Sequence, residues 1–103
     1  MKYSPTPIEM DLFKVITLLD DEKEAMNFLR DLLTGPEIKE FANRWRVVQM
    51  LQNKTAYKII EKETGMSSTT IARVQKWLTD GMSGYKTMLK KINNASSIHH
   101  SST

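Results

Sequence analysis

The residue types best suited to binding chemistry are gathered in one short segment, residues 67–78. If this segment is a helix, which turns by about 100° per residue, its apolar positions fall on one face and its polar positions on the other. The polar face then carries Thr69, Ala72, Arg73 and Lys76. Hydroxyl groups, a methyl group and two cations can hydrogen-bond base edges, contact a thymine methyl group and bind phosphate. The pattern therefore suits the major groove of DNA, and it equally suits a solvated helix in an ordinary bundle.

The same segment is the second half of a helix-turn-helix pattern over residues 55–78. Gly65 follows the last turn of a first short helix, and Ser67 or Ser68 can cap the second helix by accepting a backbone N–H. Apolar residues stand where such a unit packs its two helices together, at Ile60, Ile71 and Val74. We therefore predict a helix-turn-helix. Glu61 departs from the pattern, because many such units have a small residue there.

Basic charge is concentrated in the half of the chain that contains this pattern. Residues 1–43 hold five Lys/Arg and nine Asp/Glu, a balance of −4, whereas residues 44–91 hold ten against three, a balance of +7. Such asymmetry is typical of a surface that binds a polyanion. Solubility alone also explains Lys-rich helices, so the charge favours nucleic acid only because it coincides with the helix-turn-helix.

Helix start signals divide the rest of the chain into further helices. Each signal is a capping Thr or Asp followed by a Glu three residues later, in two cases with an adjoining Pro. We predict one helix from Pro7 to about Leu19, a second from the Asp20/Asp21 cap to near Leu33, a third over residues 36–53, and a last one after Gly84. With the helix-turn-helix this gives about six helices. No strand signal appears, so the predicted fold class is all-α.

The third predicted helix is apolar on more than one side. Phe41 and Trp45 belong to its apolar stripe, while Val47 and Met50 widen the apolar surface. A helix of this kind needs packing partners on more than one side. In so short a chain a second subunit is a natural source of partners, although seven Met and many Leu also allow an adaptable monomer core.

Length and composition exclude several other classes of protein. At 103 residues we expect one domain, residues 1–92, followed by a disordered polar tail, residues 93–103. No apolar run approaches the roughly 18 residues of a membrane span and no signal peptide is apparent, so we expect a cytoplasmic protein. The chain has no Cys, and His99 and His100 lack partner ligands. We therefore expect no metal site, no cofactor and no catalysis.

Two blocks of the sequence resemble the tryptophan repressor family, specifically its YerC/YecD-like branch. The blocks are LLTGPEIKEFANRWRVVQMLQ and KETGMSSTTIARVQKWL, and the likeness covers about residues 8 to 92. Shared features are Thr34, Arg44 ten residues later, and the G-x-x-x-x-T-I-x-R spacing from Gly65 to Arg73. The resemblance implies an intertwined, all-helical homodimer that binds double-stranded operator DNA through two helix-turn-helix units. These would enter successive major grooves about 34 Å apart and favour a palindromic site.

The resemblance also implies a function and the residues that contact DNA. The expected function is a sequence-specific transcriptional regulator, most directly a repressor. Ser68, Thr69 and Ala72 match groove-facing positions, and Lys58 matches a phosphate contact. Glu61 stands where the repressor has a base-reading lysine, so the preferred sequence is expected to differ. Further cations expected to bind phosphate are Lys54, Lys62 and Lys76.

An effector pocket is implied where the repressor binds tryptophan. Thr34, Arg44 and Arg73 match residues that surround this ligand. Val74 replaces a glycine and Trp77 replaces a serine, and both changes add bulk to a slot sized for an indole. We therefore expect free tryptophan to bind poorly and Trp77 to fill the slot, while a different anionic effector stays open.

Two other functions also stay open. Glu61 and the altered pocket are compatible with a helical ligand-sensing or protein-interaction module that has lost operator recognition. A nonspecific DNA-binding accessory protein, similar to the repressor-like domain of a replication initiator, is the third possibility. Comparing binding to random duplexes with binding to the protein's own upstream DNA, at moderate salt, distinguishes the three.

Overall fold

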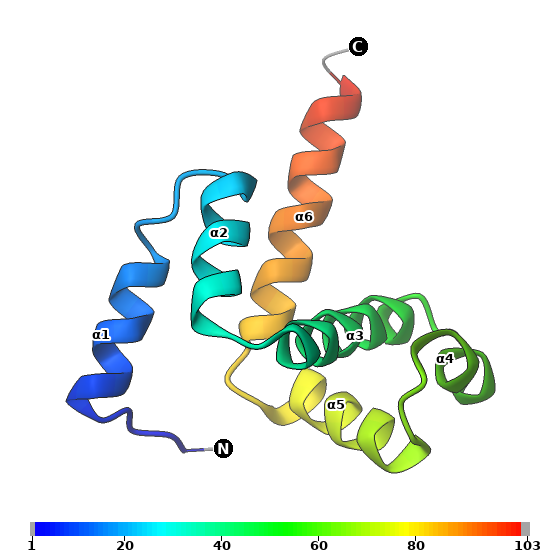
Figure 1. Cartoon of the computed structure of the whole chain (residues 1–103). Coiled ribbons are helices and arrows are strands. Elements are labelled where there is room, and N and C mark those ends of the chain that lie inside the picture. Colours follow the sequence, from blue (N-terminus) through cyan, green and yellow to red (C-terminus); the bar gives the residue numbers. More distant parts are fainter. Residues whose placement is uncertain (1, 102–103) are drawn as a thin grey trace. The chain divides into compact units, whose positions relative to one another are not determined.

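The computed structural model describes residues 2–101 and the side chains of residues 2–95. The described residues form six α-helices and no strand, which confirms the predicted all-α class (Figure 1). The helices are α1 (Pro7–Ile16), α2 (Glu22–Leu32), α3 (Gly35–Gln52), α4 (Tyr57–Thr64), α5 (Ser68–Asp80) and α6 (Gly84–Ser101).

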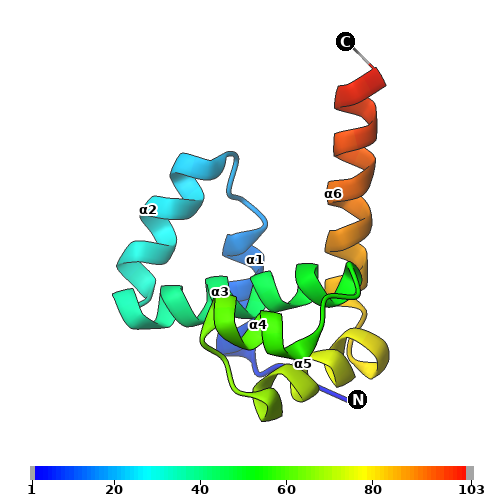
Figure 2. The same ribbon diagram turned by 90° about the vertical axis from the view of Figure 1, so that its right-hand side faces the viewer.

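The chain divides into two compact units. Residues 2–42 form the N-terminal unit, which contains α1, α2 and the first part of α3. Residues 43–101 form the C-terminal unit, which contains the rest of α3 and α4 to α6. In the C-terminal unit α5 packs against both α4 and α6 (Figure 2). The helix-turn-helix therefore lies wholly in this unit.

Two of the predicted capping boxes are present in the N-terminal unit. The backbone N–H of Thr6 donates to Glu9 Oε1 over 2.9 Å, and the backbone N–H of Glu9 donates to Thr6 Oγ1 over 3.1 Å. Thr34 and Glu37 repeat this exchange at the start of α3, over 2.9 and 3.2 Å. These pairs satisfy backbone donors that a helix N-terminus otherwise leaves without partners.

Helix α1 ends three residues earlier than the predicted limit at Leu19. Its last helical residue is Ile16, and Thr17 follows as the C-cap. The backbone N–H of Thr17 donates to the Lys14 carbonyl over 3.1 Å, and its hydroxyl donates to the same carbonyl over 2.6 Å. Bonds to the residue three positions back tighten the chain and end the α-helix there.

Helix α6 includes most of the segment for which the sequence predicts a disordered tail. It runs to Ser101, and residues 102–103 lie outside the described residues. No Gly or Pro interrupts residues 93–101, so the strongest local reason for a helix to stop is missing. Disorder of this segment in solution, and the domain boundary at residue 92, stay predictions.

The hydrophobic core of the C-terminal unit is built by α3 to α6. Its fully buried side chains are Val47, Val48, Ile60, Ile71 and Val74, each with an exposed fraction of 0%. Leu89 contributes from α6. The predicted contact between the two helices of the helix-turn-helix, through Ile60, Ile71 and Val74, is confirmed.

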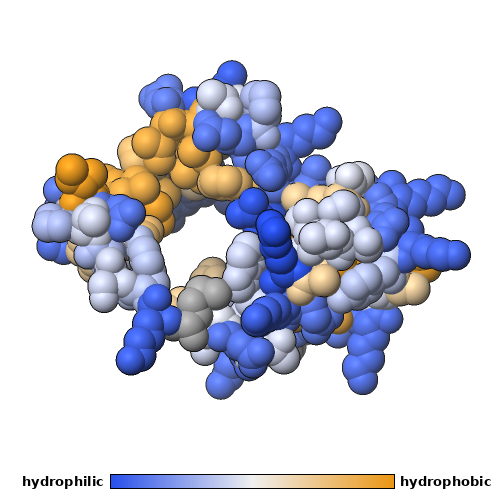
Figure 3. Space-filling view, turned by 90° about the horizontal axis from the view of Figure 1, so that it is seen from below, coloured by the Kyte–Doolittle hydropathy of each residue, from blue (hydrophilic) through white to orange (hydrophobic). Residues whose placement is uncertain are grey.

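The N-terminal unit has no comparable core. No side chain of residues 2–42 is buried, and its large apolar side chains include Ile8, 83% exposed, and Leu18, 71% exposed. Figure 3 shows apolar side chains gathered on this unit, at the left of the view. Contiguous apolar surface of this kind marks a site that another surface covers.

Candidate nucleic-acid interface

The turn between α4 and α5 is fixed by a left-handed glycine and a serine cap. Gly65 has a φ of 72° and a ψ of 6°, and its N–H donates to the Glu61 carbonyl over 2.8 Å. Ser67 then caps α5 by accepting a hydrogen bond from the backbone N–H of Thr70 over 3.2 Å. Of the two serines that the sequence offers as caps, Ser67 takes this role. The orientation of α5 against α4 therefore follows from local sequence.

A buried threonine stabilises the same turn. The hydroxyl of Thr64, 8% exposed, donates to the Ile60 carbonyl over 2.7 Å and accepts from the backbone N–H of Met66 over 3.2 Å. Both ends of the hydroxyl are thus satisfied, which removes the cost of burying it. The bonds tie the last turn of α4 to the chain that leads into α5.

An ion pair joins α4 to α3 at the surface. The guanidinium of Arg46 donates through Nε and Nη2 to Glu63 Oε1, over 3.1 and 3.0 Å. Both side chains are about half exposed, at 52% and 46%. A pair this exposed contributes little to stability. The pair nevertheless links the first helix of the helix-turn-helix to α3 at the surface.

The outward face of α5 is a shallow surface whose residues are mostly polar or charged. Five exposed residues line it, and they are Ser68, Thr69, Ala72, Arg73 and Lys76. We call this set the α5 surface. It unites four residues predicted to contact DNA with Arg73, which the spacing places on the same polar face and the family resemblance assigns to an effector pocket.

The remaining predicted DNA-contact residues lie on α4 and on the turn before it. Lys58 and Lys62 are exposed and one helical turn apart, while Glu61 is half-buried between them. Lys54 is exposed in the α3–α4 turn and has a φ of 58°. The predicted DNA-contact residues therefore carry four lysines and one acid, which gives the helix-turn-helix a net positive potential.

The residues assigned to an effector pocket are not gathered around one cavity of the C-terminal unit. Val74 is fully buried in the core, and Trp77 packs against that core from its edge. Arg73 belongs to the α5 surface, while Arg44 is half-buried on α3. Thr34 lies in the N-terminal unit, where it caps α3. An effector site built from these residues stays a prediction.

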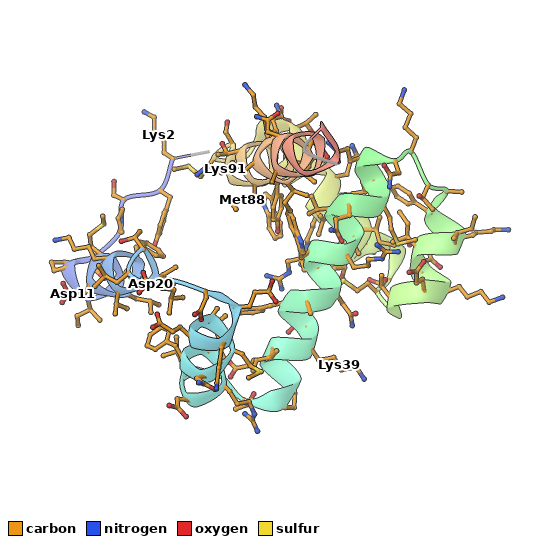
Figure 4. The ribbon with its side chains drawn as sticks, turned by 90° about the horizontal axis from the view of Figure 1, so that it is seen from above. Lys2, Asp11, Asp20, Lys39, Met88 and Lys91 are labelled. Carbon is orange, nitrogen blue, oxygen red and sulfur yellow. The ribbon has the colours of Figure 1, made fainter. Side chains whose placement is uncertain are left out.

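Trp77 instead lines an apolar hollow of about 470 Å³. The other lining residues come from α3, from the α5–α6 turn and from α6, and they are Trp45, Gly81, Met82, Gly84, Tyr85 and Met88. The rings of Trp45 and Tyr85 lie 6.3 Å apart. Figure 4 labels Met88 among the side chains of α6. We call this cavity the aromatic hollow.

The sequence analysis did not assign the aromatic hollow. A signal was present, because Trp45 lies in the apolar stripe of α3 and Tyr85 and Met88 are three residues apart on the last helix. Periodicity identifies such residues as apolar, but it does not show that two helices leave a space between them.

The described residues also bear on metal sites and on membrane-spanning helices. No group of three or more His, Asp or Glu in the described part of the chain could hold a metal ion. The histidines at positions 99 and 100 lie beyond the described side chains. No helix within residues 2–101 has the length and apolar character needed to cross a membrane.

Comparison with known proteins identifies the family. A family model described as Trp repressor protein matches residues 10–93. The uncharacterized protein YerC of Bacillus subtilis (strain 168) is 40% identical over 85 residues, which are 82% of this chain and 82% of YerC. The crystal structure of a TrpR-like protein from Eubacterium eligens ATCC 27750 superposes with a TM-score of 0.81 at 34% identity, covering 85% of this chain and 91% of that one. The chain belongs to the Trp repressor family, and its six-helix fold is Trp-repressor-like.

Proposed function

We propose that the protein is a sequence-specific DNA-binding transcriptional regulator, acting as a homodimeric repressor in the cytoplasm. The observation that carries this proposal is the α5 surface. Helix α5 buries Ile71 and Val74 completely, and the opposite side presents hydroxyl groups, a methyl group and cations. This is the chemistry that reads base edges in a major groove. Membership of the Trp repressor family supports it.

Phosphate binding would come from the lysines around this surface. Lys54, Lys58 and Lys62 are exposed on α4 and the turn before it, and Lys76 is exposed on α5. Contacts of this kind position a protein on the duplex and release condensed counterions, so they make affinity depend on salt. Base contacts from Ser68, Thr69 and Ala72 would then supply sequence preference.

A homodimer is supported by apolar surface that the single chain leaves uncovered. No side chain of residues 2–42 is buried. On α6, Met88 is 48% exposed and Ile92 is 41% exposed, on the side that borders the aromatic hollow. A second copy of the chain would bury these surfaces. Two α5 helices related by a two-fold axis would then reach successive major grooves about 34 Å apart, which favours a palindromic operator.

Operator binding without tryptophan is part of the proposal. Val74 has an exposed fraction of 0% and Trp77 packs against the same core, and both add bulk where the family resemblance implies a glycine and a serine beside the corepressor. Interiors are close-packed, and adding an indole to a filled site forces other groups to move. The packing therefore supports a reading helix that is held in place by the protein itself.

A second candidate is a ligand-sensing or protein-interaction module that has lost operator recognition. The aromatic hollow favours it, because its volume of about 470 Å³ and its apolar lining are typical of a small-molecule site. Half-buried Glu61 on α4 also weakens the approach of phosphate. The α5 surface makes the DNA-binding regulator the better supported of the two.

Selection from a pool of random duplexes tests the proposal. The purified protein is mixed with the pool at moderate salt, and bound duplexes are recovered and sequenced. We expect a palindromic motif to be enriched, and we expect Thr69→Val, which removes one hydroxyl group from the α5 surface, to alter it. The matched control is Thr87→Val on α6, which should leave the motif unchanged. Equal recovery of all duplexes would favour a nonspecific accessory protein, and no recovery would favour the module.

A further inference from the structure

Arg73 lies where it can contact DNA. Its side chain is exposed and lines the same shallow surface as Thr69, Ala72 and Lys76. At about 100° per residue, Arg73 points roughly 50° to one side of the line opposite the buried stripe of α5, and Ala72 points roughly 50° to the other side. Arg73 therefore faces outward as directly as Ala72 does. Family resemblance would instead make it the ligand of an effector carboxylate.

The immediate surroundings of Arg73 offer its side chain no acidic partner. The next residue, Val74, is fully buried in the core, whereas Arg73 itself is exposed. Among the described residues no carboxylate forms an ion pair with Arg73. The only acid of α5 is Asp80, at the far end of the helix. The guanidinium is thus available to an acceptor that approaches from outside.

We propose that Arg73 is a base-reading residue whose guanidinium donates two hydrogen bonds to O6 and N7 of a guanine in the major groove. The inference rests on the proposed DNA-binding function and adds a specificity-determining residue to it. A guanidinium presents a rigid fork of donors that matches these two acceptors, whereas the ammonium of Lys76 is a point charge suited to phosphate. The neighbouring small side chains of Thr69 and Ala72 allow close approach of the helix to the bases.

The test compares three variants by duplex selection and by binding to the selected duplex. Arg73→Ala removes the donors, and Arg73→Lys keeps the charge but loses the fork. Lys39→Ala is the control, because Lys39 is an exposed cation that projects from α3 in the N-terminal unit (Figure 4). Circular dichroism and melting temperature establish that each variant is folded.

The expected result is a loss of discrimination at one base pair of each half-site. The wild-type motif should contain a guanine there, and substituting that base pair should weaken wild-type binding by about 5- to 150-fold. Arg73→Ala and Arg73→Lys should both lose this preference, while Arg73→Lys keeps the wild-type salt dependence. Lys39→Ala should behave as the wild type.

Other outcomes overturn the inference and separate it from the proposed function. A uniform loss over all duplexes on Arg73→Ala, restored by Arg73→Lys, would assign Arg73 to phosphate. If Arg73→Ala binds the same motif with the same affinity as the wild type, Arg73 does not contact DNA. The proposed DNA-binding function would then still stand, because the wild-type protein binds. A folded wild-type protein that binds no duplex would overturn both.

Discussion

Gly65 sets the direction in which the chain enters α5. Its φ of 72° lies in the left-handed region, which a residue with a Cβ atom adopts only at a cost. Farther along α5, Val74 belongs to the buried core and Trp77 packs against it. Single residues thus fix how α5 is presented, while control of its tilt by a ligand stays a prediction.

Replacing Gly65 with Ala should destabilise the protein by about 1–2 kcal/mol. No atom lies within 4 Å of a Cβ added there, so the cost is conformational and not steric. Urea unfolding measures the change. Gly35→Ala is the matched control, because a Cβ at that position also meets nothing within 4 Å and no positive φ is required. Equal stability of the two variants would show that the turn does not depend on the left-handed glycine.

L-Tryptophan should not bind at micromolar concentration. Val74 is fully buried and stands where the family resemblance implies a glycine, so an indole seated there would have to displace packed side chains. Titration calorimetry with the wild-type protein measures this directly. Heat that fits a micromolar dissociation constant would mean that the pocket is open and that α5 is under corepressor control.

Helices α1 and α3 begin at capping boxes whose carboxylates are held by hydrogen bonds. The backbone N–H of Thr6 is the main reason why the pKa of Glu9 is lowered, and the hydroxyl of Tyr3 adds to it. For Glu37, the backbone N–H of Thr34 lowers the pKa in the same way. Each of these helix starts is therefore coupled to the charge of one glutamate.

Acidification should weaken the starts of α1 and α3. A lowered folded-state pKa means that the stabilisation is complete above the unfolded-state value of about 4.3 and is lost as pH falls through the folded value. NMR titration of the Glu9 and Glu37 side chains should show both pKa values below the ordinary one. The backbone signals of Thr6 and Thr34 should shift with the same midpoints. Ordinary pKa values in both glutamates would contradict the capping account, and Glu9→Gln should abolish the transition at α1 alone.

Local sequence signals made the helices predictable, whereas features that depend on tertiary packing could not be predicted. Thr6, Thr34, Gly65 and Ser67 fix helix ends through their own neighbours in sequence, so their roles could be predicted from the sequence. The burial of Ile60, Ile71 and Val74 followed from the spacing of apolar residues, because apolar residues three or four positions apart share one face of a helix. The outward placement of Arg73 followed from helical spacing in the same way, whereas the aromatic hollow depends on how helices from distant parts of the chain meet. No local pattern encodes that.

At the scale of the whole molecule, the two units differ in what they bury. The C-terminal unit has its own core, whereas the described N-terminal side chains remain at least partly exposed. A chain of this size buries a smaller share of its surface on folding than a larger one does. Apolar faces that stay exposed favour association with another surface. This contrast is the physical basis for proposing that two copies assemble before either one functions.

Solution mass should correspond to two chains. Analytical ultracentrifugation measures it, and Met88→Asp should raise the dimer dissociation constant at least about a hundredfold, because it would bury an unpaired charge in the interface. Ile59→Asp is the matched control, since Ile59 is 55% exposed on α4 and should have little effect on dimer formation. A monomeric wild-type protein, or equal effects of both substitutions, would contradict the proposed interface.

The most direct test is the affinity of the protein for a selected duplex, measured by fluorescence anisotropy as salt is varied. If the two helix-turn-helix units of a dimer together neutralise about six phosphates, the logarithm of the association constant should fall linearly with the logarithm of salt concentration, with a slope of about −5. Lys58→Ala should reduce the magnitude of this slope while leaving the preferred sequence unchanged. An affinity that does not change with salt, or no binding to any duplex, would contradict the account.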